Sequence, residues 1–366
     1  MFENTNTNMS ANKVNEAMDT NSQVKVKNLS QAEQLWAQHQ SKPGLISSLK
    51  WFYHTTVGDS HRELLKPIAW YNQLYWWSYT FQSDRRHYLV QPRPLSLKRL
   101  AGIIKPNLQS PIFIVGAPRS GTTFLGNSIA SIPEISYHFE PVATKAATRY
   151  VYNQLWNENK SRRFYQFFYA WLMRIHGDGD LRFAEKTPQI SFIIPFLAKV
   201  FPQAKFIHII RDGRDVALSL AAKPWHQSTP SSVRDPDGYL CGPSARFWVE
   251  PQRVEEFETT TDLHRCIWIW RRHVEAVLQA KENLAGEAYH ELKYEDLVRN
   301  PGQEAHKIIE FLNISHPNAR KIFQNAVTGN VKTDSVGRWK EFLSPEQQEQ
   351  LNQETTSLME KLKYSN

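Results

Sequence analysis

One short segment constrains the fold of this chain more than any other. Ile112–Val115 is an uninterrupted apolar run between Pro111 and Gly116, which is typical of a strand buried on both faces of a sheet. The loop that follows has glycines at 116 and 121, and a helix is predicted directly after it, over 122–132. In a strand, loop and helix of this order, backbone N–H groups and the helix N-terminus face one point. The sequence therefore predicts an α/β fold with a phosphate-binding loop at the end of this strand.

Further along the chain, strands and helices are expected to alternate. The segment 224–261 is rich in Pro, Ser, Gly and Asp, and is expected to be a long loop of the kind that often forms a lid. The alternation predicts a parallel sheet flanked by helices on both faces. The expected strands are Lys205–Ile210 and Tyr289–Tyr294, and the expected helices are 191–201, a helix through Leu220, one from the capping residue Thr261 to about Gly286, 302–312 and 345–362.

The amino-terminal hundred residues are expected to differ in character from the rest. Residues 1–28 hold seven Asn and few apolar side chains, which predicts a disordered tail. Residues 29–105 are predicted to be a helical, aromatic-rich extension ahead of an α/β domain over 106–366, with a basic, proline-rich connector at 84–110. Trp70, Leu74, Trp77 and Phe81 share one helical face, which fits either the main core or a membrane surface.

Composition limits the location and the partners of the chain. The sequence has no apolar run long enough to cross a membrane and no apolar core of a secretory signal, so we expect a cytoplasmic protein, with peripheral membrane contact open through the aromatic stripe. Cys241 and Cys266 are too few for a disulfide framework or a cysteine-based zinc cluster, and no metal is expected. The net charge of +8 favours anionic partners, but no long basic run or RNA-binding aromatic motif indicates nucleic acid.

The phosphate-binding loop departs from the pattern of nucleotide triphosphatases in one respect. In the stretch GAPRSGTT, which begins at Gly116, a threonine stands where a Walker loop has its lysine. Arg119 supplies a cation inside the loop instead, and neighbouring hydroxyls add hydrogen-bond donors. The loop is therefore expected to hold a single 5′-phosphate that carries a transferable group. Its expected contacts come from Arg119, Ser120, Gly121, Thr122 and Thr123.

This loop resembles the 5′-phosphosulfate loop of the sulfotransferases that use 3′-phosphoadenosine 5′-phosphosulfate (PAPS). The segment RDGRDVALS, from Arg211 to Ser219, looks like the 3′-phosphate motif of that family, and Arg211 falls at a strand end, where ligands bind in open α/β sheets. YEDL and GRWK segments are also similar to the family, although Asp-Ser-Val stands here where the cytosolic small-molecule enzymes have Arg-Lys-Gly. The resemblance covers roughly 110–345 and implies PAPS as donor, with further contacts from Arg211, Ser219, Lys223, Tyr294, Ser335, Arg338 and Lys340.

Sulfuryl transfer requires removal of a proton from the acceptor and neutralisation of charge on the bridging oxygen. Glu140 is the predicted base, by resemblance to sulfotransferases that use a glutamate in this region. His138 is the competing base, or one of the two orients the other, because strand alternation would place both on one side. Lys186 lies in an EKTP segment similar to that of carbohydrate sulfotransferases. It is expected to act as the acid, with Arg119 as the anion clamp.

The sequence thus predicts an enzyme that moves a sulfuryl group from PAPS to a hydroxylated acceptor. The resemblance is closer to the carbohydrate and tyrosyl-protein type than to the cytosolic small-molecule type, and a carbohydrate or glycolipid-like acceptor is expected. Two other classes stay open: a P-loop kinase or phosphotransferase, which the missing lysine disfavours, and a non-catalytic anion-binding module, which the net charge suggests.

Overall fold

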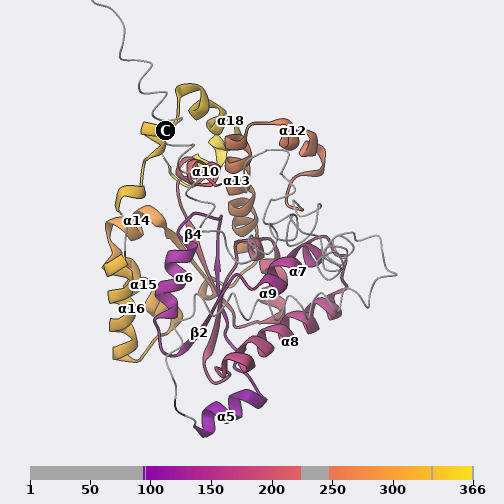
Figure 1. Ribbon diagram of the computed structural model, residues 1–366, viewed down its shortest axis with the longest axis vertical. Coiled ribbons are helices and arrows are strands. Elements are labelled where there is room, and N and C mark those ends of the chain that lie inside the picture. The colour runs from indigo at the N-terminus through magenta and orange to yellow at the C-terminus, as the bar shows by residue number, and fades with distance from the viewer. Residues whose placement is uncertain (1–93, 95, 224–246, 331–332, 365–366) are drawn as a thin grey trace, which may run out of the picture. The chain divides into compact units, whose positions relative to one another are not determined.

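The computed structural model describes residues 94, 96–223, 247–330 and 333–364, drawn in colour in Figure 1. All of these residues belong to one compact unit that spans 57–366. The tail expected at 1–28, nearly all of the extension expected at 29–105 and the first part of the expected loop at 224–261 lie outside the described residues. No helix within the described ranges is long and apolar enough to cross a membrane.

Five parallel strands form one sheet in the order β2-β3-β1-β4-β5. The central strand β1 pairs with both β3 and β4, and all four of its residues are completely buried. This arrangement confirms the predicted α/β class and the parallel sheet. The strands are β1 (Ile112–Val115), β2 (Ile135–Phe139), β3 (Arg182–Lys186), β4 (Lys205–Ile210) and β5 (Tyr289–Lys293).

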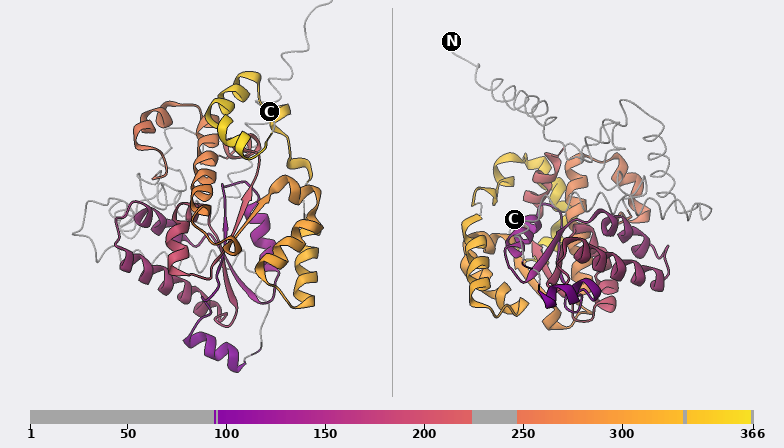
Figure 2. Two further views of the ribbon diagram at one scale, coloured as in Figure 1. Left: turned by 180° about the vertical axis from the view of Figure 1, so that it is seen from behind. Right: turned by 60° about the horizontal axis from the view of Figure 1, so that its bottom comes forward.

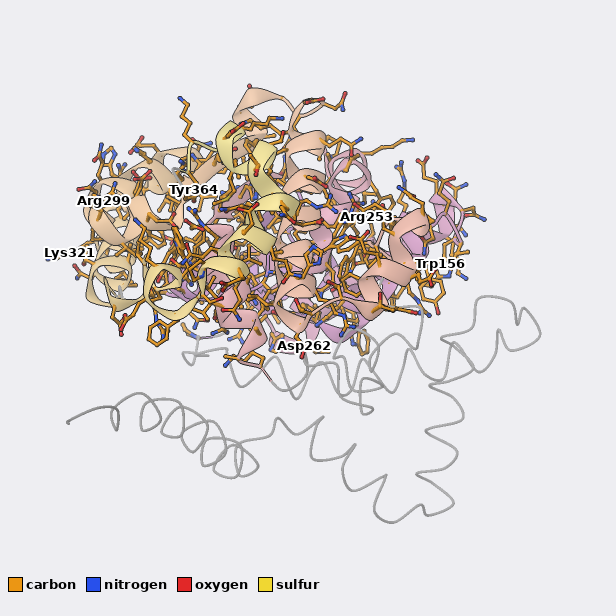
Figure 3. The ribbon with its side chains drawn as sticks, turned by 90° about the horizontal axis from the view of Figure 1, so that it is seen from above. Trp156, Arg253, Asp262, Arg299, Lys321 and Tyr364 are labelled. Carbon is orange, nitrogen blue, oxygen red and sulfur yellow. The ribbon has the colours of Figure 1, made fainter. Side chains whose placement is uncertain are left out.

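Helices cover both faces of the sheet, as Figures 1 and 2 show. Seen from above, Arg299 and Lys321 of one helical layer lie far from Trp156 and Arg253 on the other side (Figure 3). The α-helices are α5 (Leu97–Ile104), α6 (Thr122–Ala130), α7 (Val142–Tyr152), α8 (Glu158–His176), α9 (Ile194–Val200), α10 (Gly213–Ala221), α12 (Val254–Thr259), α13 (Asp262–Lys281), α14 (Tyr294–Arg299), α15 (Pro301–Leu312), α16 (Pro317–Asn330), α17 (Trp339–Phe342) and α18 (Pro345–Lys361). Short 3-10 helices are η3 (Pro188–Ile193), η6 (Pro251–Arg253), η7 (Gly286–Ala288) and η8 (Thr333–Ser335).

The side chains of the strands alternate between two apolar layers, as the period of a strand requires. Phe113, Phe183 and Phe206 pack into the layer that α8 and α9 complete. Ile112 and Ile207 pack into the opposite layer with α6, α15 and α16. Because both faces of the sheet are covered, the ends of its strands are where polar side chains can gather.

The predicted helices agree with the structure except at their ends. Thr261 caps α13 as expected, since its hydroxyl accepts a hydrogen bond from the His264 backbone N–H at 3.2 Å. That helix ends at Lys281 rather than near Gly286. The helix expected over 191–201 is a 3-10 helix up to Ile193 and becomes α-helical only from Ile194.

Helix α5 lies in the segment that was expected to be a connector. Its one buried residue is Gly102, which packs so closely on Gly179 that a Cβ at either position would fall within 2.5 Å of the other's backbone. Arg99 Nε donates to the Gly177 carbonyl at 2.8 Å, and Arg174 Nε of α8 donates to the Ile103 carbonyl at 2.8 Å. These contacts fix α5 beside the turn that leads into β3, at the edge where the strands begin.

Candidate functional site

The loop from Gly116 to Gly121 curls tightly between β1 and α6. Three of its residues have φ in the left-handed region: Gly116 at 135°, Arg119 at 70° and Gly121 at 95°. The loop is held from outside, because the Gly116 N–H donates to the hydroxyl of Ser191 in η3 at 3.1 Å. Sequence reasoning did not single out Ser191, since a serine in a predicted helix carries no signal of this contact.

The loop has the features that an anionic group requires. Gly121 is the N-cap of α6 and offers no side-chain cap, so the helix N-terminus is open to a ligand. The Ser120 hydroxyl is completely buried and has no hydrogen-bond partner among the described residues. A buried hydroxyl without a partner is costly, and a phosphate oxygen would satisfy it. Thr122 is buried beside it, whereas Thr123 is exposed.

Arg211, at the end of β4, joins the loop to distant parts of the chain. Its Nη1 donates to the Arg119 carbonyl at 3.2 Å, its Nη2 donates to the Ser335 carbonyl, and its guanidinium lies 4.9 Å from the centre of the Tyr294 ring. The Arg211 carbonyl in turn accepts from Trp270 Nε1 at 3.0 Å, which anchors it to α13. The structure therefore brings this strand end, the loop and η8 together.

Two further contacts complete this cluster. Arg119 Nε donates to the Ser219 hydroxyl at 3.1 Å, and the hydroxyls of Tyr294 and Ser335 are 2.8 Å apart. Burial, together with the charge of Arg211, lowers the pKa of Arg119. Arg119 is exposed at the surface of the loop, whereas Arg211 is buried. Two neighbouring guanidiniums repel each other, so a bound anion would relieve the cost. The Nε of Arg211, buried and without a partner within the described part, adds to the demand for an acceptor.

The GRWK segment is held by Asp215 of α10, whose carboxylate also lies 3.8 Å from Nη2 of Arg211. The Asp215 carboxylate accepts from the backbone N–H groups of Gly337 at 2.7 Å and Trp339 at 3.0 Å, and burial raises its pKa. Arg338 and Lys340 are exposed and lie over the rings of the neighbouring Phe342 and Trp339. The described geometry thus places the segment beside α10 but does not bring these two cations to the loop. The half-buried Lys223 follows α10 by two residues, and its role stays a prediction.

Glu140 and Lys186 meet at the ends of β2 and β3. The Glu140 N–H donates to the Lys186 carbonyl at 2.9 Å, and its carboxylate bonds the Lys186 ammonium directly. The Glu140 side chain is 26% exposed, whereas that of Lys186 is 1% exposed. Burial lowers the pKa of Lys186, the Glu140 carboxylate opposes this shift, and the charges of Lys145 and Arg119 add to it. The site therefore holds a carboxylate open to solvent on top of a buried cation, within electrostatic reach of the phosphate-binding loop.

His138, the competing base, lies in the interior of the sheet. It is completely buried, its ring stacks on Phe183 at 4.9 Å, and its Nε2 is 3.0 Å from the Ser136 hydroxyl. The alternation that was expected to place His138 and Glu140 on one side does not hold, because a φ of 41° at Glu140 turns the chain out of the strand conformation. Which residue is the base stays a prediction, but only Glu140 has an open side chain.

A buried carboxylate that sequence reasoning missed stands behind these groups. Glu185 is completely buried and accepts hydrogen bonds from Thr144 at 2.7 Å, from Thr187 at 2.8 Å and from the Tyr169 hydroxyl. Thr144 lies in the first turn of α7, directly after Glu140. Glu185 therefore ties the helix that follows the proposed base to the strand that carries Lys186.

Comparison with known proteins matches the chain to one family. The family model described as "Sulfotransferase family" matches residues 111–318. Protein-tyrosine sulfotransferase A of Caenorhabditis elegans is 25% identical over 225 residues, which are 57% of this chain and 51% of that protein. Protein-tyrosine sulfotransferase 1 of Danio rerio is 25% identical over 221 residues, 56% of this chain and 53% of that protein. The chain thus spans about half the length of these curated relatives.

Among solved structures, the chain is similar to two sulfotransferase domains. The domain from the curacin biosynthetic pathway has a TM-score of 0.44 and 15% identity, with 70% of this chain and 98% of that domain covered. The domain from the Synechococcus PCC 7002 olefin synthase has a TM-score of 0.44 and 19% identity, with 72% and 96% covered. Because the family model matches more than half of its length, this chain belongs to the sulfotransferase family of PAPS-dependent enzymes.

Proposed function

We propose that this protein transfers the sulfuryl group of PAPS to a hydroxyl of its acceptor, with Glu140 as the general base. One observation carries the proposal. The Glu140 carboxylate is the partly exposed member of a pair whose other member, Lys186, is buried. The charge of Arg119 in the phosphate-binding loop lowers the pKa of Lys186, and the charge of Glu140 acts to raise the pKa of Arg119. A base, an acid and an anion clamp thus converge from three strand ends.

The residues present fit the donor in two places. The buried Ser120 hydroxyl without a partner and the open N-terminus of α6 would hold the 5′-phosphosulfate. Arg211, Ser219 and Ser335 would hold the 3′-phosphate, with the Tyr294 ring beside the adenine. When bound, PAPS supplies the activated sulfuryl group, and the chain supplies position and charge.

Each catalytic side chain has a distinct task in this proposal. The acceptor hydroxyl replaces the Lys186 ammonium as the hydrogen-bond partner of the Glu140 carboxylate, and Glu140 then accepts the proton of that hydroxyl. Lys186 is then free to donate a proton to the bridging oxygen, and its lowered pKa makes that donation easier. Arg119 keeps its charge and neutralises the oxygens of the group in transfer.

For the acceptor, we propose the hydroxyl of a tyrosine in a protein. The relatives named above are protein-tyrosine sulfotransferases, and the carbohydrate or glycolipid-like acceptor expected from the EKTP segment is not confirmed. A phenol, with an ordinary pKa of about 10, is a substrate from which a carboxylate can remove a proton as the sulfur–oxygen bond forms.

Two measurements test the proposal separately. Calorimetry should show tighter binding of 3′-phosphoadenosine 5′-phosphate (PAP) than of AMP, and equal affinities would contradict the second phosphate site. Incubation with ³⁵S-labelled PAPS should label a tyrosine-containing peptide but not the same peptide with phenylalanine. If an added oligosaccharide is labelled instead, the proposed tyrosine acceptor is wrong and the proposed donor PAPS stands. Turnover of ATP with Mg²⁺ would support a kinase.

A further inference from the structure

Helix α5 displays its large apolar side chains to solvent. Leu97 is 86% exposed, Leu100 is 48%, Ile103 is 43% and Ile104 is 82%. The helix is held by the close contact at Gly102 and by hydrogen bonds from two arginines, and not by burial of these side chains. A helix that is attached through a glycine and turns its leucines and isoleucines outward is typical of a binding surface.

A second exposed apolar group continues this surface on α8. Phe167 and Trp171, one turn apart, are 46% and 38% exposed, and their rings stack at 6.2 Å. Arg174 follows on the same face of the helix and donates to the carbonyls of Ile103 and Ile104 at the end of α5. The α5–α8 patch is therefore defined as Leu97, Leu100, Ile103, Ile104, Phe167 and Trp171.

Basic side chains dominate the two helices that carry this patch. Residues 97–105 and 158–176 contain seven Lys or Arg and one acidic residue, Glu158, and Asp180 follows in the turn that packs on α5. Glu158 is already paired with Arg162 and Lys199. The seven cations are Lys98, Arg99, Lys105, Lys160, Arg162, Arg163 and Arg174.

We propose that the α5–α8 patch binds the surface of an anionic lipid bilayer. Exposed aliphatic and aromatic side chains enter the headgroup boundary, while surrounding Lys and Arg side chains attract anionic lipids. A second copy of this chain fits less well, because a symmetric contact would bring the same cations face to face. The charge of the surroundings therefore selects the bilayer over a self-contact.

The position of the patch determines how a bound molecule would be oriented. Helix α5 directly precedes β1 and packs on the turn that leads into β3, so it lies where the strands begin, at the bottom of Figure 1 and forward in the right view of Figure 2. The sulfuryl-transfer residues lie where the strands end. A molecule attached through α5 would thus turn its site away from the lipid, toward hydroxyls presented in water.

Co-sedimentation of the full chain with vesicles tests the proposal. Vesicles of phosphatidylcholine with phosphatidylglycerol should bind the protein, and vesicles of phosphatidylcholine alone should bind it less. The double variant Leu100→Glu/Ile104→Glu and the single variant Trp171→Glu should each lower binding about tenfold or more. Raising the salt from 0.1 to 1 M shortens the screening length from about 10 to about 3 Å and should weaken binding further.

The matched control is Val254→Glu, the same kind of change at an exposed apolar residue of α12, which lies at the other end of the structure in Figure 1. It should bind vesicles as the parent chain does. Unchanged binding by the patch variants would overturn the proposal. A change of oligomeric state in the patch variants would also overturn it, because it would indicate that a second copy of the chain occupies the patch. A lower melting temperature of these variants with unchanged vesicle binding would overturn it as well, because it would indicate that the chain's own residues 1–93 cover the patch. None of these readouts requires sulfuryl transfer, so the proposal can fail while the proposed function stands.

Discussion

At the scale of single residues, the backbone conformation of Glu140 determines where its carboxylate points. A φ of 41° is unfavourable for a residue with a Cβ, at a cost of roughly 1–2 kcal/mol. The position is nevertheless fixed, because the Glu140 N–H bonds Lys186 and the side chain of Glu185 holds the next helix. Strain of this kind, held by surrounding contacts, is common where a side chain must be aimed for chemistry.

Glu140→Gln should therefore leave the affinity for PAP unchanged and lower kcat by about 10²–10⁴-fold, because glutamine keeps the size but cannot accept the proton. Single-turnover rates with saturating PAPS measure the effect. His138→Asn is the control: as a change in the core it should reduce the free energy of unfolding, with a milder loss of rate. The reverse order, with Glu140→Gln active and His138→Asn inactive, would make His138 the base.

Arg211→Ala should weaken the binding of PAP by roughly 10- to 150-fold, the value of a hydrogen bond to a charged group. The affinity for AMP should change much less, since AMP has no 3′-phosphate. Arg211→Lys should restore only part of the loss, because an ammonium cannot reproduce the fork of a guanidinium. Titration calorimetry of all three proteins provides the comparison, and equal losses for PAP and AMP would mean that Arg211 supports the fold instead.

The sequence predicted the grouping of Arg119, Arg211 and Ser219 better than the support behind Glu140. The structure brings these three residues together, because strand ends and glycine loops have a fixed place in a parallel sheet, and their role in binding PAPS stays a prediction. The orientation of His138 against Glu140 could not be found, since one left-handed residue reverses the alternation on which the expectation rested. Glu185 was missed because its hydrogen-bond partners come from elements that the sequence did not reveal.

At the scale of elements, β4 carries a titratable group into the core. His208 is completely buried, and burial lowers its pKa to about 3 from an ordinary 6.5. The folded chain thus keeps this histidine neutral, whereas the unfolded chain takes up a proton below pH 6.5. The free energy of unfolding should therefore fall as the pH falls from about 6.5 toward 3.

His208→Gln should make this fall shallower, because the titrating group is gone while a hydrogen bond to Tyr289 can be kept. Urea unfolding at several pH values between 7 and 4 measures the slope. His306→Gln, at an exposed histidine of α15, should leave the slope unchanged. A slope that is equal in all three proteins would mean that other groups cause the acid sensitivity.

The burial and the charge of each segment explain which elements were predictable. β1 and β4 match their predicted bounds, because continuous apolar runs are unmistakable where both faces are buried. β3 has the sequence RFAEK and was not predicted, since its charged side chains are satisfied only by partners that come from other elements. Helix α8 was also not predicted, although its buried residues, among them Tyr165, Phe168 and Leu172, recur at helical spacing.

At the scale of the whole molecule, one ion cluster joins segments about a hundred residues apart. Glu354 of α18 bonds Arg253 of η6 at 2.9 Å and Arg271 of α13 at 2.6 Å, and His264 Nε2 lies 3.1 Å away (Arg253 is labelled in Figure 3). Although Glu354, His264 and Glu256 are close enough to share a cation, two guanidiniums already occupy their carboxylates. The cluster thus attaches the carboxyl-terminal helix to the core.

Glu354→Gln should lower the free energy of unfolding by about 1.5–3 kcal/mol, because two partly buried arginines lose their counter-charge. Hydrogen bonds from His264, Arg253 and Arg271 outweigh the effect of burial and hold the pKa of Glu354 at about 2, below its ordinary 4.5. The stabilisation is therefore present above pH 4.5 and is lost as the pH falls toward 2. Chemical denaturation at pH 7 checks the value. Glu349→Gln removes the same charge from an exposed position of α18, and an equal loss there would contradict the assignment.

The contact between Gly102 and Gly179 has a consequence for how relatives of this chain can vary. A Cβ on Gly102 would clash with the backbone of Gly179 and Asp180, and a Cβ on Gly179 would clash with the backbone of Gly102. Backbone atoms cannot rotate away as the end of a side chain can. Neither position can accept a larger residue alone. Among close relatives, these two positions should therefore both stay glycine or both change. A relative that keeps only one of the two glycines should not hold the helix before β1 against the turn that leads into β3.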